Sequence, residues 1–241
     1  MSLNVQKTFY VVFHRAKLKA GSNITLSMND TILNKTSSIK YLGIIIDHKL
    51  KWNEHIAYVK NKIAKGVGIM YRARSLLDKR RLVDLYYSFV YPYLIYCVEV
   101  WGCANQNHLT PLVLMQKKIV RIITFSTYLA HTQPLFHNLS ILPLDKLILD
   151  RIGILMFKYS NGLLPDIINR LYVKNKDIHY HNTRSKNRLR APTGSMYFTN
   201  TSAHLWNVLV TKIDVHVSLS KFKLILKSFL LNNTVDLKYS K

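Results

Sequence analysis

The chain has 241 residues, with 35 Lys and Arg against 12 Asp and Glu, and a formal net charge of +23 at neutral pH. Hydrophobic residues make up 49% and aromatic residues 11%, which excludes a disordered basic tail. The length allows one large domain or two modest ones, and two cysteines cannot build a disulfide framework. A compact chain of this charge repels itself unless a polyanion neutralises it. Nucleic acid is therefore the first partner class to consider and an anionic membrane the second.

The N-terminal part carries strand patterns. Residues 8–14 are rich in β-branched and aromatic side chains and predict a strand. Residues 24–28 and 32–34 flank an Asn-Asp pair with turn chemistry and predict a hairpin. Residues 39–47 predict the strongest strand, with Gly43 in its middle marking a bulge or a close backbone approach.

Beyond these strands the apolar period becomes helical. Apolar residues at three- and four-residue spacing predict an amphipathic helix at about 52–75. A second helix follows, which Asp78 caps and whose apolar face is Leu82, Leu85, Tyr86, Phe89 and Val90. Further helices are expected at about 110–126, 144–160, 166–172, 202–213 and 220–232, the last capped by Ser220. Residues 173–200 lose the periodicity and gain charge, which predicts a loop or linker. Strands followed by helices indicate the α+β class.

One stretch has the length of a membrane span. Residues 85–104 contain a single charged residue, Glu99. They also contain five tyrosines and Pro92 and lack dense Leu, Ile and Val, so we predict a buried core helix and no membrane partner. The apolar run 9–13 is too short for a signal-peptide core, and an intracellular location, nucleus or cytoplasm, is expected.

The carboxylates decide whether the chain itself is a catalyst. Two-metal phosphoryl transfer needs at least two carboxylates that converge on ions about 4 Å apart. No two acidic residues are adjacent or separated by one residue, and Asp145 and Asp150, the closest pair, lie about 140° apart around a helix. Cys97, Cys103 and His108 lack the close pairing of a zinc site. The sequence therefore predicts no catalytic residue, no metal site and no cofactor in this chain.

Basic residues gather between 60 and 81, with Asp78 as the only acid among them. Tyr58 and Tyr71 are interleaved and offer planar surfaces for stacking beside the cations. A solvated face is the simplest interpretation of such a run, but the missing acids favour contacts to a nucleic-acid backbone that do not read bases. The candidate nucleic-acid-binding residues along the chain are Lys60, Lys62, Lys65, Arg72, Arg74, Lys117, Lys118, Arg121, Arg184, Lys186, Arg188 and Arg190.

A series of short motifs runs along almost the whole chain. In order they are Leu3-Asn4-Val5-Gln6-Lys7-Thr8, Lys40-Tyr41-Leu42-Gly43-Ile44-Ile45-Ile46-Asp47, Leu50-Lys51-Trp52 with His55-Ile56, Tyr91-Pro92-Tyr93-Leu94, Trp101-Gly102, Gln116-Lys117-Lys118 with Arg121-Ile122, His131-Thr132-Gln133-Pro134-Leu135-Phe136, Asn182-Thr183-Arg184-Ser185, Leu205-Trp206-Asn207 and Phe222-Lys223. Singly each motif is weak. In this order they resemble the C-terminal part of the reverse transcriptases of non-LTR (LINE-type) retrotransposons, of the jockey and chicken-repeat sort.

The resemblance implies a polymerase hand entered partway through its palm. It assigns the chain to three regions: 1–50, the end of the palm with a hairpin like the primer grip; 51–165, a helical thumb-like domain; and 166–241, a basic linker and a helical C-terminal region. Within the first region it implies that Lys7 is the palm-motif lysine. The primer-grip-like residues would be Tyr41, Leu42 and Gly43.

The resemblance also implies which parts are elsewhere. The catalytic aspartates of this family would lie upstream of Met1, so Mg²⁺ is expected only for a complete polymerase. We therefore expect a fragment that is inactive alone, binds RNA or an RNA–DNA duplex without sequence preference, and has the N-terminal polymerase half as a further partner. Two alternatives stay open: a basic interaction module that binds an acidic protein or an anionic membrane, and a non-functional product.

Overall fold

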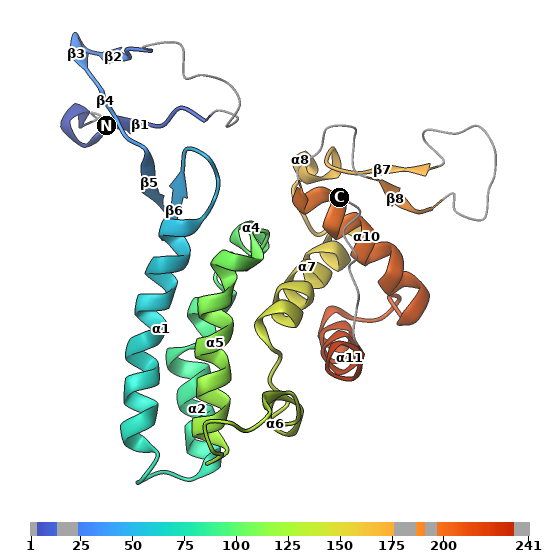
Figure 1. Cartoon of the computed structure of the whole chain (residues 1–241). Coiled ribbons are helices and arrows are strands. Elements are labelled where there is room, and N and C mark those ends of the chain that lie inside the picture. The colour runs from blue at the N-terminus through green and yellow to red at the C-terminus, as the bar shows by residue number, and fades with distance from the viewer. Residues whose placement is uncertain (1–3, 14–23, 176–186, 191–196, 234–241) are drawn as a thin grey trace.

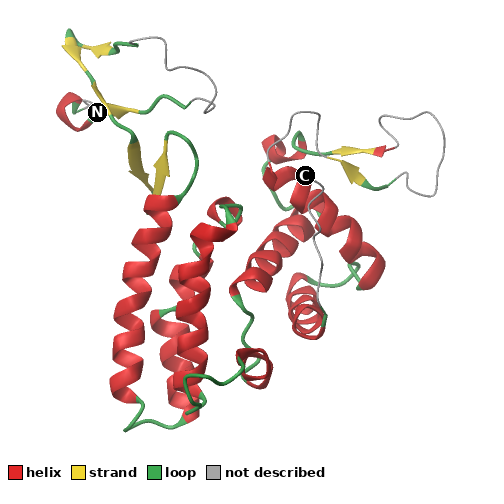
Figure 2. Cartoon of the chain, in the orientation of Figure 1, coloured by secondary structure: helices red, strands yellow, loops and turns green. Residues whose placement is uncertain are grey.

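The computed structural model describes residues 4–13, 24–175, 187–190 and 197–233 (Figure 1). Small strand pairs at the N-terminal end stand above a bundle of long helices, and a second group of helices lies beside that bundle. Figure 2 shows that helices make up most of the described chain and that the strands are short. The predicted α+β class is confirmed.

The N-terminal strands form two-stranded ladders. They are β1 (Phe9–Tyr10), β2 (Ser27–Met28), β3 (Thr31–Ile32), β4 (Asn34–Lys35), β5 (Ser38–Tyr41) and β6 (Ile44–Asp47), after a short 3-10 helix η1 (Val5–Lys7). β2 and β3 form the expected antiparallel hairpin, with Asn29 and Asp30 at positive φ in its turn. The strand expected at 8–14 shortens to β1, which pairs with β4 in parallel. The strand expected at 39–47 is instead the antiparallel hairpin β5–β6, which turns at Leu42 and Gly43.

The bundle is built from α1 (Asn53–Ala73), α2 (Lys79–Phe89) and α5 (Gln106–Ile123). The predicted apolar stripe of α1 is buried, with Ile63 and Met70 at most 1% exposed. Asp78 caps α2 as predicted, because its carboxylate accepts a hydrogen bond from the Arg81 N–H at 2.8 Å. α1 and α5 pack along their lengths and end at the same end of the bundle, opposite the β5–β6 hairpin (Figure 1).

The single core helix expected at 85–104 is wrong. The segment breaks into the end of α2, α3 (Tyr91–Ile95) and α4 (Val98–Trp101). The ring of Pro92 removes a backbone donor at the start of α3, and Cys97 adopts a left-handed conformation, φ 49°, between α3 and α4. Phe89, which the pattern placed on the buried face, is 43% exposed. Among the described helices none is long and apolar enough to cross a membrane.

The C-terminal half is mainly helical. Its elements are α6 (Thr132–Asn138), α7 (Leu144–Ser160), α8 (Asp166–Asn169), β7 (Val173–Lys174), β8 (Leu189–Arg190), α10 (Tyr197–Lys212) and α11 (Leu219–Asn232). α7 has the predicted limits. β7 and β8 pair antiparallel inside the segment expected to be a loop. α11 is capped by Ser218 rather than Ser220, since the Ser218 hydroxyl accepts from the Lys221 N–H.

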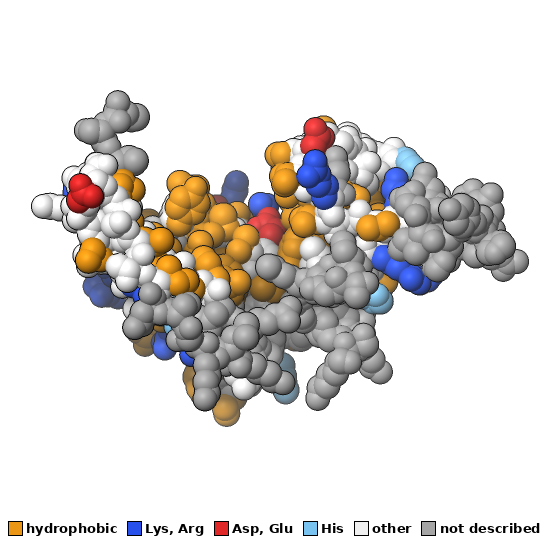
Figure 3. Space-filling view, turned by 90° about the horizontal axis from the view of Figure 1, so that it is seen from above, with side chains coloured by type: hydrophobic (Ala, Val, Ile, Leu, Met, Phe, Trp, Pro, Cys, Tyr) orange, Lys and Arg blue, Asp and Glu red, His pale blue; other side chains and the backbone are white. Residues whose placement is uncertain are grey.

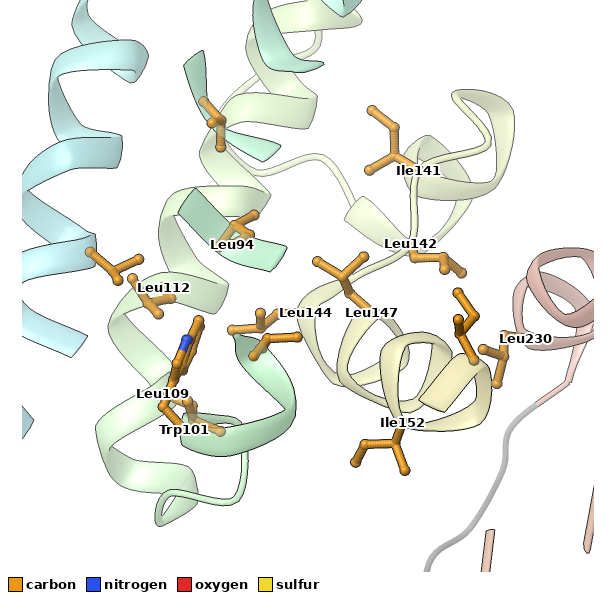
Figure 4. Close-up of a cluster of buried hydrophobic side chains, with 14 of the residues drawn as sticks. Leu94, Trp101, Leu109, Leu112, Ile141, Leu142, Leu144, Leu147, Ile152 and Leu230 are labelled. Carbon is orange, nitrogen blue, oxygen red and sulfur yellow. The ribbon is translucent and has the colours of Figure 1, made fainter. Parts of the chain in front are cut away.

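The core runs without interruption from the bundle into the C-terminal helices. Figure 4 shows Trp101 and Leu112 on the bundle side, Leu144 and Leu147 of α7 in the middle, and Leu230 of α11 beyond them. α7 packs on α4 and α5 and also on α10 and α11. The domain limits expected from the sequence stay a prediction. α7 ends before the expected limit at 165 and packs on α10 and α11, which follow that limit.

A candidate nucleic-acid interface

The β5–β6 hairpin presents a strained and exposed turn. Tyr41 and Ile44 are its last cross-strand pair, so two residues make the turn, and both have positive φ: Leu42 at 44° and Gly43 at 86°. Such turns favour Asn and Gly, and a leucine in the left-handed region costs on the order of 1 kcal/mol. The Leu42 side chain is 73% exposed and that of Tyr41 is 62% exposed. The hairpin thus places two large side chains and accessible backbone at its tip.

Tyr96 supports this turn from the segment between α3 and α4. Its hydroxyl donates to the Leu42 carbonyl at 2.5 Å. A Cβ built on Gly43 would lie 3.3 Å from the Tyr96 ring, so the ring lies directly on the glycine. Two features therefore require glycine at position 43: the positive φ angle and the close approach of the Tyr96 ring. The sequence indicated the close approach but gave no sign of its partner, which lies more than fifty residues along the chain.

Asp47 fixes the base of the hairpin to the start of α1. Its buried carboxylate accepts three backbone N–H groups, from Lys49 at 3.0 Å, Lys51 at 3.1 Å and Trp52 at 2.8 Å. Burial by itself would raise the pKa of this carboxyl group, but the backbone hydrogen bonds outweigh burial and leave the pKa below its usual value. Asp47 is therefore a structural anion that holds the turn between β6 and α1.

His55 joins the hairpin to the bundle from inside. The side chain is 2% exposed, and its Nδ1 accepts from the Ile45 N–H at 3.3 Å. Its ring meets that of Trp101 edge-on, with centroids 5.6 Å apart. Burial lowers the pKa of His55 and so favours the neutral imidazole. The hydrogen bond that Nδ1 accepts places the proton of this imidazole on Nε2. The sequence placed this histidine in the series of motifs but gave no sign of its hydrogen-bond partner, which lies on another element.

Two lysines flank one tyrosine ring where the hairpin meets α1. The Nζ of Lys40 lies 4.9 Å from the centroid of Tyr58, and the Nζ of Lys62 lies 5.4 Å from it. A cation over an aromatic face is held by the ring quadrupole. Lys62 and Tyr58 were candidates from the sequence. Lys40 was missed because it belongs to a strand that the sequence treated as an extended ladder.

The basic residues of α1 fall on two different faces. Successive helical residues turn by about 100°, so Lys62 and Lys65 lie about 60° apart and Arg72 lies within about 20° of Lys65. Lys60 lies about 160° from Lys62 and belongs to another side of the helix. Lys60, Lys65 and Arg72 are exposed and Lys62 is half-buried. We call Lys40, Tyr58, Lys62, Lys65 and Arg72 the duplex face.

The remaining candidates of the bundle have local contacts. The Arg74 guanidinium carbon lies 5.4 Å from the Phe125 ring centroid, and Arg121 donates from Nε to the Ala130 carbonyl at 3.0 Å. On α5, Lys117 is half-buried and Lys118 is exposed. Their motif neighbour Gln116 is 1% exposed and structural: its Nε2 donates to the Tyr86 hydroxyl at 3.1 Å and to the Leu142 carbonyl at 2.9 Å.

Candidates near the two ends lie away from the duplex face. Lys7 is exposed in η1, at the N-terminal end (Figure 1). Arg188 and Arg190 are exposed at the β7–β8 pair, on the opposite side of the molecule from α1 (Figure 1). Arg184 and Lys186 lie outside the described residues. The structure therefore brings together only part of the predicted set.

The Leu-Trp-Asn motif near the C-terminus has a structural role. The Asn207 side chain accepts from the Leu189 N–H and donates to the Leu189 carbonyl, both at 2.9 Å. It thereby occupies the place of a neighbouring strand beside β8. Trp206 is buried near Phe222 of α11, with ring centroids 6.3 Å apart. The motif fixes the β7–β8 pair to α10 and α10 to α11.

Several of the described acids have partners within the fold. Besides Asp47 and Asp78, Glu99 accepts from Arg151 Nε at 3.2 Å, Glu54 accepts from the Ser38 hydroxyl at 2.6 Å, and Asp84 lies 3.5 Å from Arg81. Among the described residues no three His, Cys, Asp or Glu side chains come close enough together to hold a metal ion. The described site has the chemistry of an anion-binding surface.

Comparison with known proteins gives this surface a context. The chain is 29% identical over 149 residues to the RNA-directed DNA polymerase from mobile element jockey of Drosophila melanogaster, covering 60% of the chain and 16% of that protein. It is 28% identical over 144 residues to the jockey enzyme of Drosophila funebris, covering 58% and 15%. It is 22% identical over 144 residues to the probable polymerase from transposon X-element of Drosophila melanogaster, covering 58% and 16%.

The match therefore spans less than a fifth of the length of these curated relatives. No family model matches the chain, and no solved structure matches it. The order of motifs and the curated matches agree, and they place this chain among the relatives of the RNA-directed DNA polymerases of non-LTR retrotransposons.

Proposed function

We propose that the chain binds RNA or an RNA–DNA duplex, as the thumb and primer-grip part of a reverse-transcriptase-related protein. The duplex face of α1 contacts the phosphate backbone, and the tip of the β5–β6 hairpin, Tyr41 and Leu42, lies against the end of a strand. Contacts of this kind position a duplex without reading its bases. The activity for which the relatives are named, RNA-directed DNA polymerisation, supports this ligand class.

The observation that carries the proposal is the pair of lysines around Tyr58. Lys40 of β5 and Lys62 of α1 flank one ring, so the hairpin and the helix share a single cationic surface. Lys65 and Arg72 continue this surface along α1, whose 21 residues extend for about 30 Å. A row of cations at helical spacing beneath an exposed turn suits a polyanion that runs along the helix.

A filter-binding titration at several NaCl concentrations tests the proposal. The logarithm of the association constant should fall linearly with the logarithm of salt, by about 0.7 to 0.9 for each phosphate contacted. The double variant Lys62→Glu/Lys65→Glu should weaken binding and flatten this slope. The matched control is Lys60→Glu/Lys221→Glu, which makes the same charge change at exposed positions off the duplex face.

Two results would count against the duplex face. Equal loss of affinity in both double variants would mean that net charge alone holds the nucleic acid. Binding that does not change with salt, or no binding, would remove nucleic acid as the ligand. Binding to an acidic protein that only the Lys62→Glu/Lys65→Glu variant loses would instead support a non-catalytic interaction module.

We further propose that the chain alone does not polymerise. The support is the work that its described acids already do, as caps and ion-pair partners of the fold. Primer extension on a primed RNA template, with Mg²⁺ or Mn²⁺ and the purified chain, should give no product. Template-dependent incorporation that persists in a repeatedly purified preparation would refute this part.

The rest of a polymerase is the second partner that we propose. Seen from above, apolar side chains gather over the middle of the molecule (Figure 3). Near the hairpin tip Leu42, Tyr96 and Val100 are between 46% and 73% exposed. Co-expression with the preceding palm segment of a jockey polymerase should give a complex that Val100→Asp weakens and Val210→Asp, at another exposed valine, does not.

A further inference from the structure

The end of the bundle opposite the hairpin carries exposed apolar side chains. The loops after α1 and α5 meet there. The guanidinium of Arg74, which follows α1, lies over the ring of Phe125, which follows α5. Leu76 and Leu129 are each 84% exposed and Tyr128 is 83% exposed. We call Arg74, Leu76, Phe125, Tyr128 and Leu129, together with Arg121, the distal tip. In Figure 1 it lies at the lower end of α1, α2 and α5.

Hydrogen bonds fix the loop that carries Tyr128. The Ser126 N–H donates to the Arg121 carbonyl at 3.0 Å, and the Ala130 N–H donates to the Thr127 carbonyl at 3.2 Å. Arg121 Nε donates to the Ala130 carbonyl at 3.0 Å, which closes the turn. Tyr128 and Leu129 are the central residues of this turn, so their positions are set before any ligand arrives. Preorganisation of this kind lowers the entropic cost of binding.

The charge and the rings of the distal tip point to one ligand chemistry. The Arg121 guanidinium carbon lies 5.8 Å from the Tyr128 ring centroid, and Arg74 has the same relation to Phe125. Lys79 and Arg80 follow on α2 and are exposed. The acid beside them, Asp78, is occupied as the cap of α2. Exposed rings beside guanidinium groups are the parts that stack unpaired bases and hold their phosphates.

We propose that the distal tip binds single-stranded RNA, with an unpaired base stacked on Tyr128 and its phosphates beside Arg121 and Arg74. This inference rests on the proposed function, since it assigns the tip to a strand that continues from a duplex on the duplex face. The tip lies about 30 Å from the hairpin, at the far end of α1. A duplex laid along α1 would therefore release its unpaired strand at Tyr128.

Fluorescence anisotropy on labelled RNA–DNA hybrids tests the tip separately from the duplex face. The probes are a blunt hybrid and the same hybrid with a single-stranded RNA extension of about ten nucleotides, within the ~4–16 nucleotides that such sites cover. The extension should tighten binding about five- to a hundredfold, the range that stacking one base supplies. An abasic extension of equal length and charge should not.

Tyr128→Leu keeps the exposed turn apolar but removes the ring, and it should abolish the gain from the extension while leaving the affinity for the blunt hybrid unchanged. Leu129→Ala is the matched control in the same turn, equally exposed, and should keep the gain. Both side chains are in solvent, so equal melting temperatures of the two variants and the unaltered chain will show that the fold is intact.

Three outcomes would overturn the inference. The first is an abasic extension that tightens binding as much as the natural one, because charge alone would then suffice. The second is an equal effect of Tyr128→Leu and Leu129→Ala. The third is binding to phosphatidylserine vesicles that Leu76→Ala and Leu129→Ala abolish, which would make the tip a membrane contact. If the blunt hybrid does not bind at all, the duplex face fails, and the single-stranded RNA alone still tests the tip.

Discussion

Asp150 of α7 is a buried carboxyl group beside Lys227, and both line a cavity of about 50 Å³ together with Tyr87 and Tyr91. Burial raises its pKa from 3.8 to about 6, and nearby Arg151 and Lys227 offset only part of that effect. The folded chain therefore binds a proton here more tightly than the unfolded chain. The free energy of unfolding therefore falls as the pH rises from about 4 to 6, and above pH 6 the whole of this loss remains.

Replacing Asp150 by Asn should accordingly stabilise the chain at high pH. We expect the free energy of unfolding to rise by on the order of 3 kcal/mol at pH 8, and this gain to vanish near pH 4, since a pKa unit corresponds to ~1.4 kcal/mol. Urea unfolding of the Asp150→Asn variant and of the unaltered chain at pH values between 4 and 8 measures this gain. Asp145→Asn, at an exposed position of the same helix, is the control for the loss of one negative charge. A gain independent of pH would mean that Asp150 is not protonated in the folded chain.

At the scale of the elements, glycine has opposite roles in the hairpin and in α1. Gly43→Ala should destabilise the chain by roughly 1–2 kcal/mol, because φ is positive and the new Cβ would press on the Tyr96 ring. Gly68→Ala should stabilise it by up to about 1 kcal/mol, because a Cβ there meets nothing within 4 Å and alanine favours the helix. Chemical denaturation gives the free energy of unfolding of both variants. Changes of the same sign in the two variants would refute the opposite roles of these glycines.

The β7–β8 pair depends on one side chain of α10. Asn207→Asp removes the donor to the Leu189 carbonyl and places a carboxylate against that oxygen, which should cost about 1–3 kcal/mol of unfolding free energy. Asn61→Asp makes the same change at an exposed position of α1 and should stay within about 0.5 kcal/mol. Thermal melts of both variants provide the measurement. An Asn207→Asp chain as stable as the control would show that the pairing contributes nothing.

The sequence predicted elements whose information is local. The stripe of α1, the limits of α7 and the Asp78 cap depend on spacing within a few residues, and all are confirmed. The failures depend on distant contacts. The left-handed Cys97 that separates α3 from α4 has no local sign. Ser218 and Ser220 are both suitable caps, and the structure uses Ser218.

The candidate site divides in the same way. Lys62, Lys65 and Arg72 were predicted together with Lys60, because the basic run lacks compensating acids. The structure keeps the first three on one side of α1 and places Lys60 on another. The sequence could not predict the position of Lys40, because that position depends on how the hairpin packs against α1. The order of motifs identified the relatives, although no single motif did.

For the whole molecule, the uncompensated charge predicts two opposite effects of salt. Cations outnumber acids by 35 to 12, and ion pairs such as Arg151–Glu99 neutralise few of them. Salt shortens the screening length from about 10 Å at 0.1 M to about 3 Å at 1 M and weakens this self-repulsion. The melting temperature of the free chain should therefore rise with NaCl, whereas the further rise caused by RNA should shrink. A free chain that melts lower in salt would contradict this.

The contact of Tyr96 with the hairpin has a mechanical consequence. One end of the α3–α4 segment supports the turn through the Tyr96 hydroxyl, and Trp101 Nε1 donates to the Tyr96 carbonyl at 2.9 Å. The other end is wedged against α7, where a Cβ on Gly102 would come within 3.0 Å of Ile148. The segment thus connects α7 to the hairpin turn through direct contacts at both of its ends. A bulkier side chain at Ile148 would therefore displace the turn at Leu42 and Gly43, although it lies on a different element.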